Sequence, residues 1–325
     1  MNYFYDLARS ISSGHFPGQE ELDALLELPY IKTSILFPGA ELLREKYFGR
    51  KISLCTITNA KAGKCSEDCA FCAQSSHHGR GDEYPLKKWM ELSEIGKSVA
   101  GSAISRFSMV TSGKSLSPDE VQEVVKAVRD LAVNNVCTCS SLGILSSGDL
   151  DHLKKAGLKR YHHNLETAPG FFQNICTTHD ISARIKAVRD AKKAGLSVCS
   201  GGIFGIGETD AQVIELALTL KELDVDAVPV NFLVPVPGTP LESAPRITPL
   251  RCLKIISILR YILPDKEIII CGGRIENLRE LHPFIFMAGA SGLMTGNYLT
   301  RKGRMLEEDK CLIRDLGFEL DQDDS

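Results

Sequence analysis

The sequence predicts a (β/α)₈ barrel of the TIM type, and three observations lead to that fold class. Short β-rich runs alternate with amphipathic helical segments along nearly the whole chain. About eight strand–helix units can be counted, which is the number that closes a parallel barrel. The length of 325 residues fits one such barrel with N-terminal helical and C-terminal extensions. A doubly wound open sheet remains the alternative, because counting strands does not demonstrate closure.

The expected strands are eight apolar runs separated by helical or turn signals. They cover residues 52–57, 104–111, 135–140, 160–165, 197–203, 227–233, 267–271 and 292–295.

The clearest helix covers residues 117–133, where Ser117 is the expected N-cap, Pro118 the first helical residue and Glu120 the capping-box acid. Segments 209–223 and 248–263 show similar patterns. Gly157 and Gly195 end two further helices just before a strand.

Length and pattern predict a single domain, 1–325, with an acidic tail at 310–325. The net charge is −3 and no basic stripe is present, which argues against nucleic acid as a partner. No run of about 18 apolar residues could span a membrane, and no secretory signal is recognisable at the N-terminus. We therefore expect a cytoplasmic protein without a membrane partner.

The chain has eleven cysteines, and Cys65, Cys69 and Cys72 form a C-x₃-C-x₂-C run. In a reducing compartment such a run indicates a metal site rather than disulfides. A [4Fe–4S] cluster normally takes four thiolates, so three would leave one iron open for chemistry. The alternative is a zinc site completed by His77 or His78.

This run resembles the signature of the radical S-adenosylmethionine (SAM) superfamily. In that superfamily SAM chelates the open iron, and an electron from the cluster cleaves it to a 5′-deoxyadenosyl radical. The aromatic residue before the last cysteine, here Phe71, lies beside the adenine.

A second group of cysteines lies at expected strand ends. Cys139, Cys199 and Cys271 would bring thiols from three strands to one interior, which predicts a second iron–sulfur site. Cys137 shares a face with Cys139 and is a further candidate ligand. The alternative is that each is a buried apolar residue of the core. No role is assigned to Cys55, and Cys252 is expected in the core of a helix.

A longer series of motifs resembles the biotin synthase family. The matching segments, in the family's order, are 59–75, 161–167, 199–209, 229–233, 238–241, 286–290 and 296–300. The likeness spans about residues 31–309. It implies a closed barrel, a homodimer and the insertion of sulfur into dethiobiotin, with two SAM molecules cleaved and an auxiliary cluster as the sulfur source. Reduced flavodoxin or ferredoxin would donate electrons, and iron–sulfur assembly proteins would load the clusters.

The resemblance also implies roles for individual residues. Those for SAM are Phe71, Asn164, Glu166 and Ile203, and those for dethiobiotin are Asn164, Asn231, His163 and Thr300. Amides offer both donors and acceptors to a ureido ring, and a carboxylate accepts from ribose hydroxyls. The alternative for both asparagines is capping of a neighbouring strand end.

The chain departs from the better-known members, whose [2Fe–2S] cluster has three cysteines and an arginine. Ser108 stands at one cysteine position and Ile269 at the arginine, whereas Cys271 is added two residues beyond. We therefore expect a four-iron auxiliary cluster with a bound sulfide on Cys139, Cys199 and Cys271, with [2Fe–2S] as the alternative. This resembles a divergent class of the family from obligate anaerobes.

His162 and Arg301 also differ from the better-known members, near the expected substrate. A related radical SAM enzyme, of the hydrogenase-maturation or methylornithine-synthase type, is the alternative function. From a different class, a zinc-stabilised barrel without redox chemistry remains open.

Overall fold

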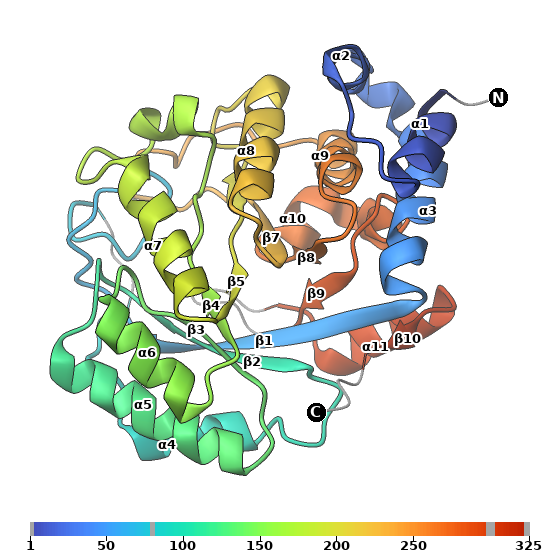
Figure 1. Cartoon of the computed structure of the whole chain (residues 1–325). Coiled ribbons are helices and arrows are strands. Elements are labelled where there is room, and N and C mark those ends of the chain that lie inside the picture. Colours follow the sequence, from blue (N-terminus) through green and yellow to red (C-terminus); the bar gives the residue numbers. More distant parts are fainter. Residues whose placement is uncertain (1–2, 79–81, 297–302, 322–325) are drawn as a thin grey trace.

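The computed structural model describes residues 3–78, 82–296 and 303–321, and a closed parallel barrel forms its centre (Figure 1). The strands pair in the order β1-β2-β3-β4-β5-β7-β8-β9, and β9 pairs back onto β1 in parallel. Their bounds are β1 (Lys51–Lys61), β2 (Arg106–Thr111), β3 (Thr138–Ser141), β4 (Arg160–His162), β5 (Ser197–Cys199), β7 (Ala227–Phe232), β8 (Glu267–Ile270) and β9 (Gly292–Met294). Closure confirms the predicted barrel and excludes the open sheet.

The strand expected at 197–203 is divided into β5 and a short β6 (Gly202–Phe204) that pairs with β7. The backbone of Gly201 causes the break. A Cβ at this position would lie 2.1 Å from the carbonyl oxygen of Pro229, so only glycine allows the two segments to approach so closely.

Helices on the outside connect successive strands. They are α4 (Trp89–Lys97), α5 (Pro118–Val133), α6 (Ser147–Ala156), α7 (Ile181–Lys193), α8 (Asp210–Glu222), α9 (Pro249–Ile262) and α10 (Arg274–Leu278). The predicted capping box of α5 is confirmed: Ser117 Oγ accepts from the Glu120 amide, and Glu120 Oε2 accepts from the Ser117 amide at 2.9 Å. Gly157 ends α6 with a φ of 112°, as expected.

The N-terminal extension is helical, as predicted, and comprises α1 (Tyr3–Ser12), α2 (Gln19–Glu27), the 3₁₀ helix η1 (Tyr30–Leu36) and α3 (Phe37–Phe48). Of these elements, η1 and α3 pack on α9, while α1 packs on α3 and α2 on α8; the residues of α9 from Cys252 to Ile262 are buried. The Tyr261 hydroxyl joins the layers by donating to the carbonyl of Phe4.

The segment 310–325 is not simply an acidic tail. Within the described residues it contains most of α11 (Leu306–Asp315) and all of β10 (Glu319–Leu320), which pairs with β1. Ile313 and Phe318 are buried in the core, and this apolar contact overrides the acidic composition that suggested a tail. Asp309 anchors the start of α11 through a buried ion pair with Arg274 at 2.8 Å.

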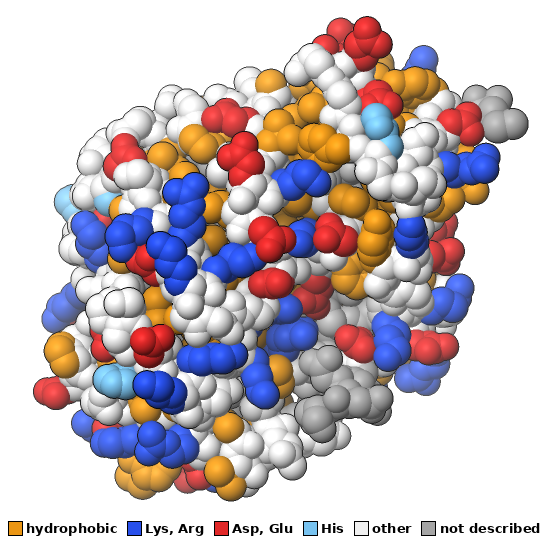
Figure 2. All heavy atoms as spheres, viewed as in Figure 1, with side chains coloured by type: hydrophobic (Ala, Val, Ile, Leu, Met, Phe, Trp, Pro, Cys, Tyr) orange, Lys and Arg blue, Asp and Glu red, His pale blue; other side chains and the backbone are white. Residues whose placement is uncertain are grey.

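On the face drawn in Figure 2, basic and acidic side chains are interspersed with apolar ones. Within the three described ranges, no helix has both the length and the apolar character needed to cross a membrane.

Candidate active site

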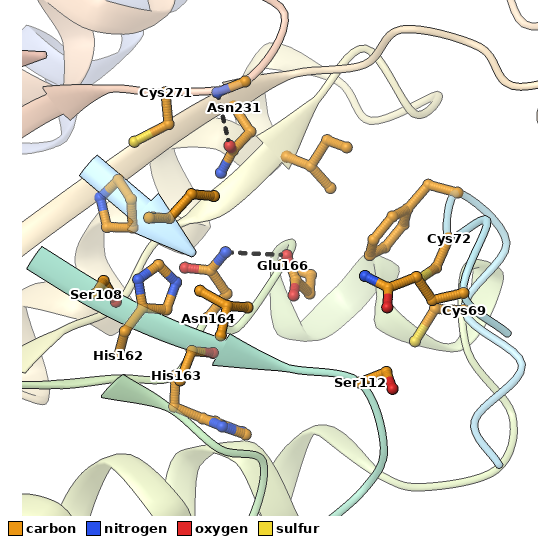
Figure 3. A pocket seen from close by; sticks show the side chains of 18 of the residues that line it. Cys69, Cys72, Ser108, Ser112, His162, His163, Asn164, Glu166, Asn231 and Cys271 are labelled. Carbon is orange, nitrogen blue, oxygen red and sulfur yellow. Dashed lines mark hydrogen bonds between the residues drawn. The ribbon is translucent and has the colours of Figure 1, made fainter. Parts of the chain in front are cut away.

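A cavity of about 470 Å³ lies inside the barrel and reaches the loop after β1 (Figure 3). Its volume is typical of small-molecule sites. Each barrel strand, in the order β1 to β5 and then β7 to β9, contributes to its lining, for example through Cys55, Ser108, Cys139, His162, Cys199, Asn231, Ile269 and Met294. The cavity therefore collects residues that are far apart in the sequence, as expected for a barrel of this type.

The three cysteines of the C-x₃-C-x₂-C run lie together at the mouth of this cavity. Backbone hydrogen bonds shape the loop that carries them: the Cys65 amide donates to the Gln74 carbonyl at 3.1 Å, and the Cys72 amide donates to the Cys69 carbonyl at 2.9 Å. Burial raises the pKa of Cys72. We call Cys65, Cys69 and Cys72 the mouth thiols.

The two histidines that could complete a zinc site bond to the loop backbone instead. His77 Nε2 lies 3.0 Å from the carbonyl oxygen of Ser66, and His78 Nε2 lies 3.1 Å from that of Cys69. Because a carbonyl only accepts, each Nε2 carries a proton and cannot bind zinc in this arrangement. The loop thus presents three thiols without a histidine at Nε2 to complete a Cys₃His set.

The four residues expected to contact SAM all line the cavity, namely Phe71, Asn164, Glu166 and Ile203. In Figure 3, Asn164 and Glu166 lie between Cys69 and Cys72 on one side and Cys271 on the other. Glu166 has a φ of 72°, a conformation that costs a non-glycine residue about 1 kcal/mol or more. The fold tolerates this strain at a residue whose carboxylate faces the cavity.

Arg184 of α7 is a site residue that the sequence analysis missed. Its Nη1 donates to the carbonyl of Asn164 at 2.9 Å and lies 3.5 Å from Glu166 Oε1, while its Nη2 lies 3.9 Å from the Cys69 sulfur. Burial raises the pKa of Glu166, and the charge of Arg184 offsets part of that rise. In the sequence, Arg184 is one of several basic residues in a helix, and nothing distinguished it.

Deeper in the barrel, the expected thiols of Cys139, Cys199 and Cys271 are buried and face the same cavity. A fourth thiol, Cys55 of β1, joins them and packs with Cys199 and Cys271. Burial raises the pKa of Cys55 to about 12 and that of Cys139 to about 11, and the neighbouring thiols add to these shifts. We call these four the interior thiols.

The sequence alone assigns no role to Cys55, because a single cysteine on a strand carries no signal. The register explains its position, since Cys55 pairs with Met294 of β9 and with Arg106 of β2, which both line the cavity. Cys137, the candidate fourth ligand, lies just before β3 and is absent from the described residues that line the cavity. Cys252 is buried in the core of α9, as expected.

A charged network forms the floor beneath the interior thiols. Glu267 Oε2 accepts from Arg160 Nη1 at 2.6 Å, and its Oε1 lies 3.4 Å from Arg106 Nη1. Burial alone would raise the pKa of Glu267, but the two arginines hold it below the usual range. These three residues were missed, although each stands on the inward face of an expected strand, where a charge is rare.

The expected substrate residues lie around the same cavity, and two of them also cap strand ends. Asn164 Oδ1 accepts from the Gly201 amide at 3.1 Å, and Asn231 Oδ1 accepts from the Gly272 amide at 3.0 Å. Both asparagines therefore cap neighbouring strand ends, as the alternative interpretation predicted. Each carboxamide still has a donor hydrogen to offer a ligand, since Nδ2 makes one bond of 3.3 Å in each case.

His163 and His162 both line the cavity, and burial lowers the pKa of each, that of His162 to about 4. His163 Nε2 is buried with no hydrogen-bond partner among the described residues. Thr300 and Arg301 lie outside the described residues.

The residues at the mouth thiols and at the interior thiols have the chemistry that iron–sulfur clusters require. All eleven cysteines are free thiols, and seven of them line one cavity. The hydroxyl of Ser108 is buried beside the interior thiols and has no hydrogen-bond partner among the residues that the structure describes, so this part of the cavity has an unused polar group as well as sulfur ligands. Thiolates are the ligands that iron–sulfur clusters require.

Comparison with protein families gives two matches. Residues 61–220 match a family described as "Radical SAM superfamily", and residues 229–319 match one described as "Biotin and Thiamin Synthesis associated domain".

Curated relatives cover nearly the full chain. A biotin synthase of Desulfatibacillum aliphaticivorans is 50% identical over 96% of this chain and 96% of its own length. One from Trichlorobacter lovleyi is 50% identical over 96% and 95%, and one from Geobacter sulfurreducens is 46% identical over 99% of both chains.

Solved structures agree on the fold. Methylornithine synthase superposes with a TM-score of 0.84 at 22% identity, covering 97% of both chains. HydG, a maturase of the [FeFe]-hydrogenase, superposes with a TM-score of 0.82 at 15% identity, covering 98% of this chain and 75% of its own. At these identities the likeness concerns the fold alone.

Proposed function

The chain belongs to the biotin synthase family, and from that premise we propose how its own residues divide the work of inserting sulfur into dethiobiotin. The enzyme is a radical SAM sulfurtransferase. The single observation that carries the proposal is that two separate sets of thiols face one cavity of ligand size. When bound, the mouth cluster and SAM supply hydrogen-atom abstraction, and the interior cluster supplies sulfur.

We assign the mouth thiols to a [4Fe–4S] cluster and the residues around Glu166 to SAM. Glu166 offers a carboxylate to the ribose hydroxyls, and Phe71 and Ile203 offer apolar surface to the adenine. Arg184 is placed to bind the carboxylate of SAM, because its guanidinium lies between Glu166 and the Cys69 sulfur. The strained backbone of Glu166 supports this assignment, since such strain persists where function over-determines the geometry.

We assign the interior thiols to the auxiliary cluster and infer a four-iron type. Cys139, Cys199 and Cys271 are the expected ligands, and Cys55 is the further thiol that packs with them. Ser108 and Ile269 offer no thiolate and no guanidinium, which argues against the [2Fe–2S] arrangement with an arginine ligand. The charges of Arg106 and Arg160 would favour thiolates at this depth, where burial alone favours neutral thiols.

We propose that dethiobiotin lies between the two thiol sets. The free amide hydrogens of Asn164 and Asn231 and the unpartnered Nε2 of His163 would meet its ureido ring. His162 is neutral at pH 7 because burial lowers its pKa to about 4, so it would contribute a hydrogen bond rather than a charge. Thr300 remains a proposed contact on the strength of the family resemblance.

The remaining partners are inferred from the family. We propose a homodimer in the reducing cytoplasm, with reduced flavodoxin or ferredoxin as electron donor and iron–sulfur assembly proteins to load the clusters. A reducing compartment suits eleven free thiols in one chain.

The test is anaerobic turnover of the reconstituted enzyme with dethiobiotin, SAM and a low-potential reductant. We expect biotin together with methionine and 5′-deoxyadenosine. Cleavage of SAM without biotin would reject dethiobiotin as the substrate and would favour a related radical SAM enzyme. Iron and sulfide counts with Mössbauer spectra on the same protein test the auxiliary cluster, since about eight irons per chain fit two four-iron clusters and about six would fit a [2Fe–2S] cluster.

A further inference from the structure

Cys176 is a buried thiol that neither cluster uses. It follows the 3₁₀ helix η2 (Pro169–Asn174), is 1% exposed, and does not belong to the described lining of the cavity. Its sulfur packs in one buried cluster with Cys69, one of the mouth thiols, and the two thiols are close enough to influence each other. Polar groups also surround it: Thr178 Oγ1 at 3.5 Å, His179 Nδ1 at 3.3 Å, and the carboxylates of Glu67 and Asp68.

The backbone holds these two sulfurs together. The Ala70 amide donates to the Ile175 carbonyl at 2.8 Å, directly beside the cysteine pair. On the other side, Asp68 Oδ1 accepts from the amides of Thr177 at 2.9 Å and Thr178 at 3.2 Å. The cluster loop and the segment after η2 are therefore joined on both sides of Cys69 and Cys176. A disulfide needs such a close and fixed approach.

The residues around Cys176 could instead bind a single metal ion. Ligand atoms of Glu67, Cys176 and His179 lie within 4.8 Å of one another. However, Arg184 Nε donates to His179 Nε2 at 2.9 Å, so Nε2 accepts and the proton of the neutral ring sits on Nδ1. That proton is donated to Glu67. The nitrogen and the carboxylate that would bind a metal thus satisfy each other, and the arrangement favours sulfur chemistry instead.

We propose that Cys176 is a resolving cysteine, which forms a disulfide with Cys69 when the mouth cluster has been lost to oxidation. The inference rests on the proposed function, because it requires Cys69 to be a cluster ligand. Cys69 lines the cavity, where a small oxidant can reach it, whereas Cys176 is shielded behind it.

The chemistry balances with hydrogen peroxide as the oxidant. The Cys69 thiol is oxidised to a sulfenic acid, and peroxide is reduced to water. The Cys176 thiol then attacks the Cys69 sulfur, the S–O bond breaks, and the hydroxyl leaves as a second water with the thiol proton. Two thiols and one peroxide thus give one disulfide and two waters. A thiol reductant reverses the step and returns Cys69 for a new cluster.

The disulfide would protect the cluster ligand Cys69 from irreversible oxidation. A sulfenic acid that meets no second thiol is oxidised further to sulfinic acid, which thiol reductants do not restore. The pair would also keep iron out of the mouth site until the disulfide is reduced. Cluster loss would therefore be a recoverable event in this chain.

The experiment compares the wild-type enzyme with Cys176→Ser and with Cys311→Ser as a matched control, since Cys311 is exposed on α11. Each protein is stripped of iron anaerobically with a chelator, exposed to two equivalents of hydrogen peroxide, alkylated and digested. The disulfide consumes one equivalent, and the sulfinic acid expected without Cys176 consumes two. Mass spectrometry should find Cys69 joined to Cys176 in wild type and control, with two hydrogens lost and full reversal by dithiothreitol. In Cys176→Ser, Cys69 should gain two oxygens, and cluster reconstitution after reduction should fall severalfold.

Three results would overturn the inference: a free, alkylated Cys176 after oxidation, a disulfide between Cys69 and Cys65 or Cys72, or one tightly bound zinc or iron per stripped chain that Cys176→Ser releases. Biotin formation by the loaded, unoxidised wild type is measured in parallel. Loss of that activity would count against the proposed function alone, because the disulfide is scored in the stripped protein.

Discussion

The mouth and interior thiols of this barrel reach one cavity by opposite routes. The mouth thiols come from eight consecutive residues of one loop, whereas the interior thiols come from β1, β3, β5 and the residue after β8. A loop can adapt its backbone to a metal, but strands present their side chains in a fixed order. The interior site is therefore set by the closure of the barrel and the mouth site by local sequence.

Their surroundings differ as well. The mouth loop is tied by polar contacts, such as those of Asp68 with the segment after η2. Three of the interior thiols, those of Cys55, Cys199 and Cys271, pack against Ile269 and Met294, and the buried charges of Arg106, Arg160 and Glu267 lie nearby. Polar contacts thus surround the mouth thiols, whereas apolar side chains and buried charges surround the interior thiols.

The largest expected effect separates the two sites by activity. Cys65→Ala should abolish SAM cleavage, a loss larger than the roughly 10- to 100-fold that removal of an outer-shell partner costs. Cys271→Ala should still cleave SAM but form no biotin, because it alters the interior alone. Quantifying 5′-deoxyadenosine and biotin in each variant tests this. Equal loss of cleavage in both would mean that the two sites do not act separately.

A second prediction sharpens which thiols belong to the interior. Cys55→Ala should lower the iron and sulfide content of the interior cluster, because Cys55 packs with Cys199 and Cys271. Cys137→Ala is the matched control and should retain both, because Cys137 is not part of the described cavity lining. Mössbauer spectroscopy on protein whose mouth site carries Cys65→Ala isolates the interior signal. An unchanged spectrum for Cys55→Ala would exclude Cys55 as a ligand.

A third prediction concerns the floor beneath the interior thiols. Glu267→Gln leaves two arginines at this depth without their counter-charge, which should cost about 3–5 kcal/mol of unfolding free energy. The control is Asp224→Asn, because the Asp224 side chain is 70% exposed where it pairs with Lys192 and Lys266. Exposed pairs contribute about 0–1 kcal/mol. Urea unfolding of the cluster-free proteins measures both, and similar losses would argue against a buried network.

The smallest expected effect is a pH dependence from His162. Its pKa is about 4 in the folded protein and 6.5 in its ordinary state, because burial disfavours the charged ring. Between these values the unfolded chain binds a proton that the folded protein does not, so stability should fall as the pH drops from 6.5 towards 4. In cluster-free protein, the free energy of unfolding should therefore decrease by about 1–3 kcal/mol less in His162→Gln than in wild type over this pH range.

The exposed His152 provides the control, since His152→Gln should leave the pH profile of unfolding as in wild type. A profile for His162→Gln that matches wild type between pH 4.5 and 6.5 would contradict the assignment of a neutral, buried ring.

The two regions also differ in how far the sequence alone predicts them. The mouth thiols and the strand–helix alternation could be predicted because both depend on residues close together in the chain. Counting strands could not establish closure, because the pairing of β1 with β9 joins residues about 240 apart along the chain, and the expectation of a closed barrel came from the family resemblance. Cys55, Arg184 and Glu267 were missed for the same reason, because the side chains that they contact in the cavity include residues far away in the sequence. Ser108 and Ile269 could be identified because the family resemblance aligned them.

The position of β1 also has a consequence for the order of assembly in time. This strand pairs with β2, β9 and β10, and β9 and β10 are synthesised long after it. The interior thiols cannot meet until Cys271 has been made and β9 has closed the ring. The mouth thiols, by contrast, exist as a set as soon as the loop is synthesised. The mouth set is therefore complete before the interior set as the chain is synthesised.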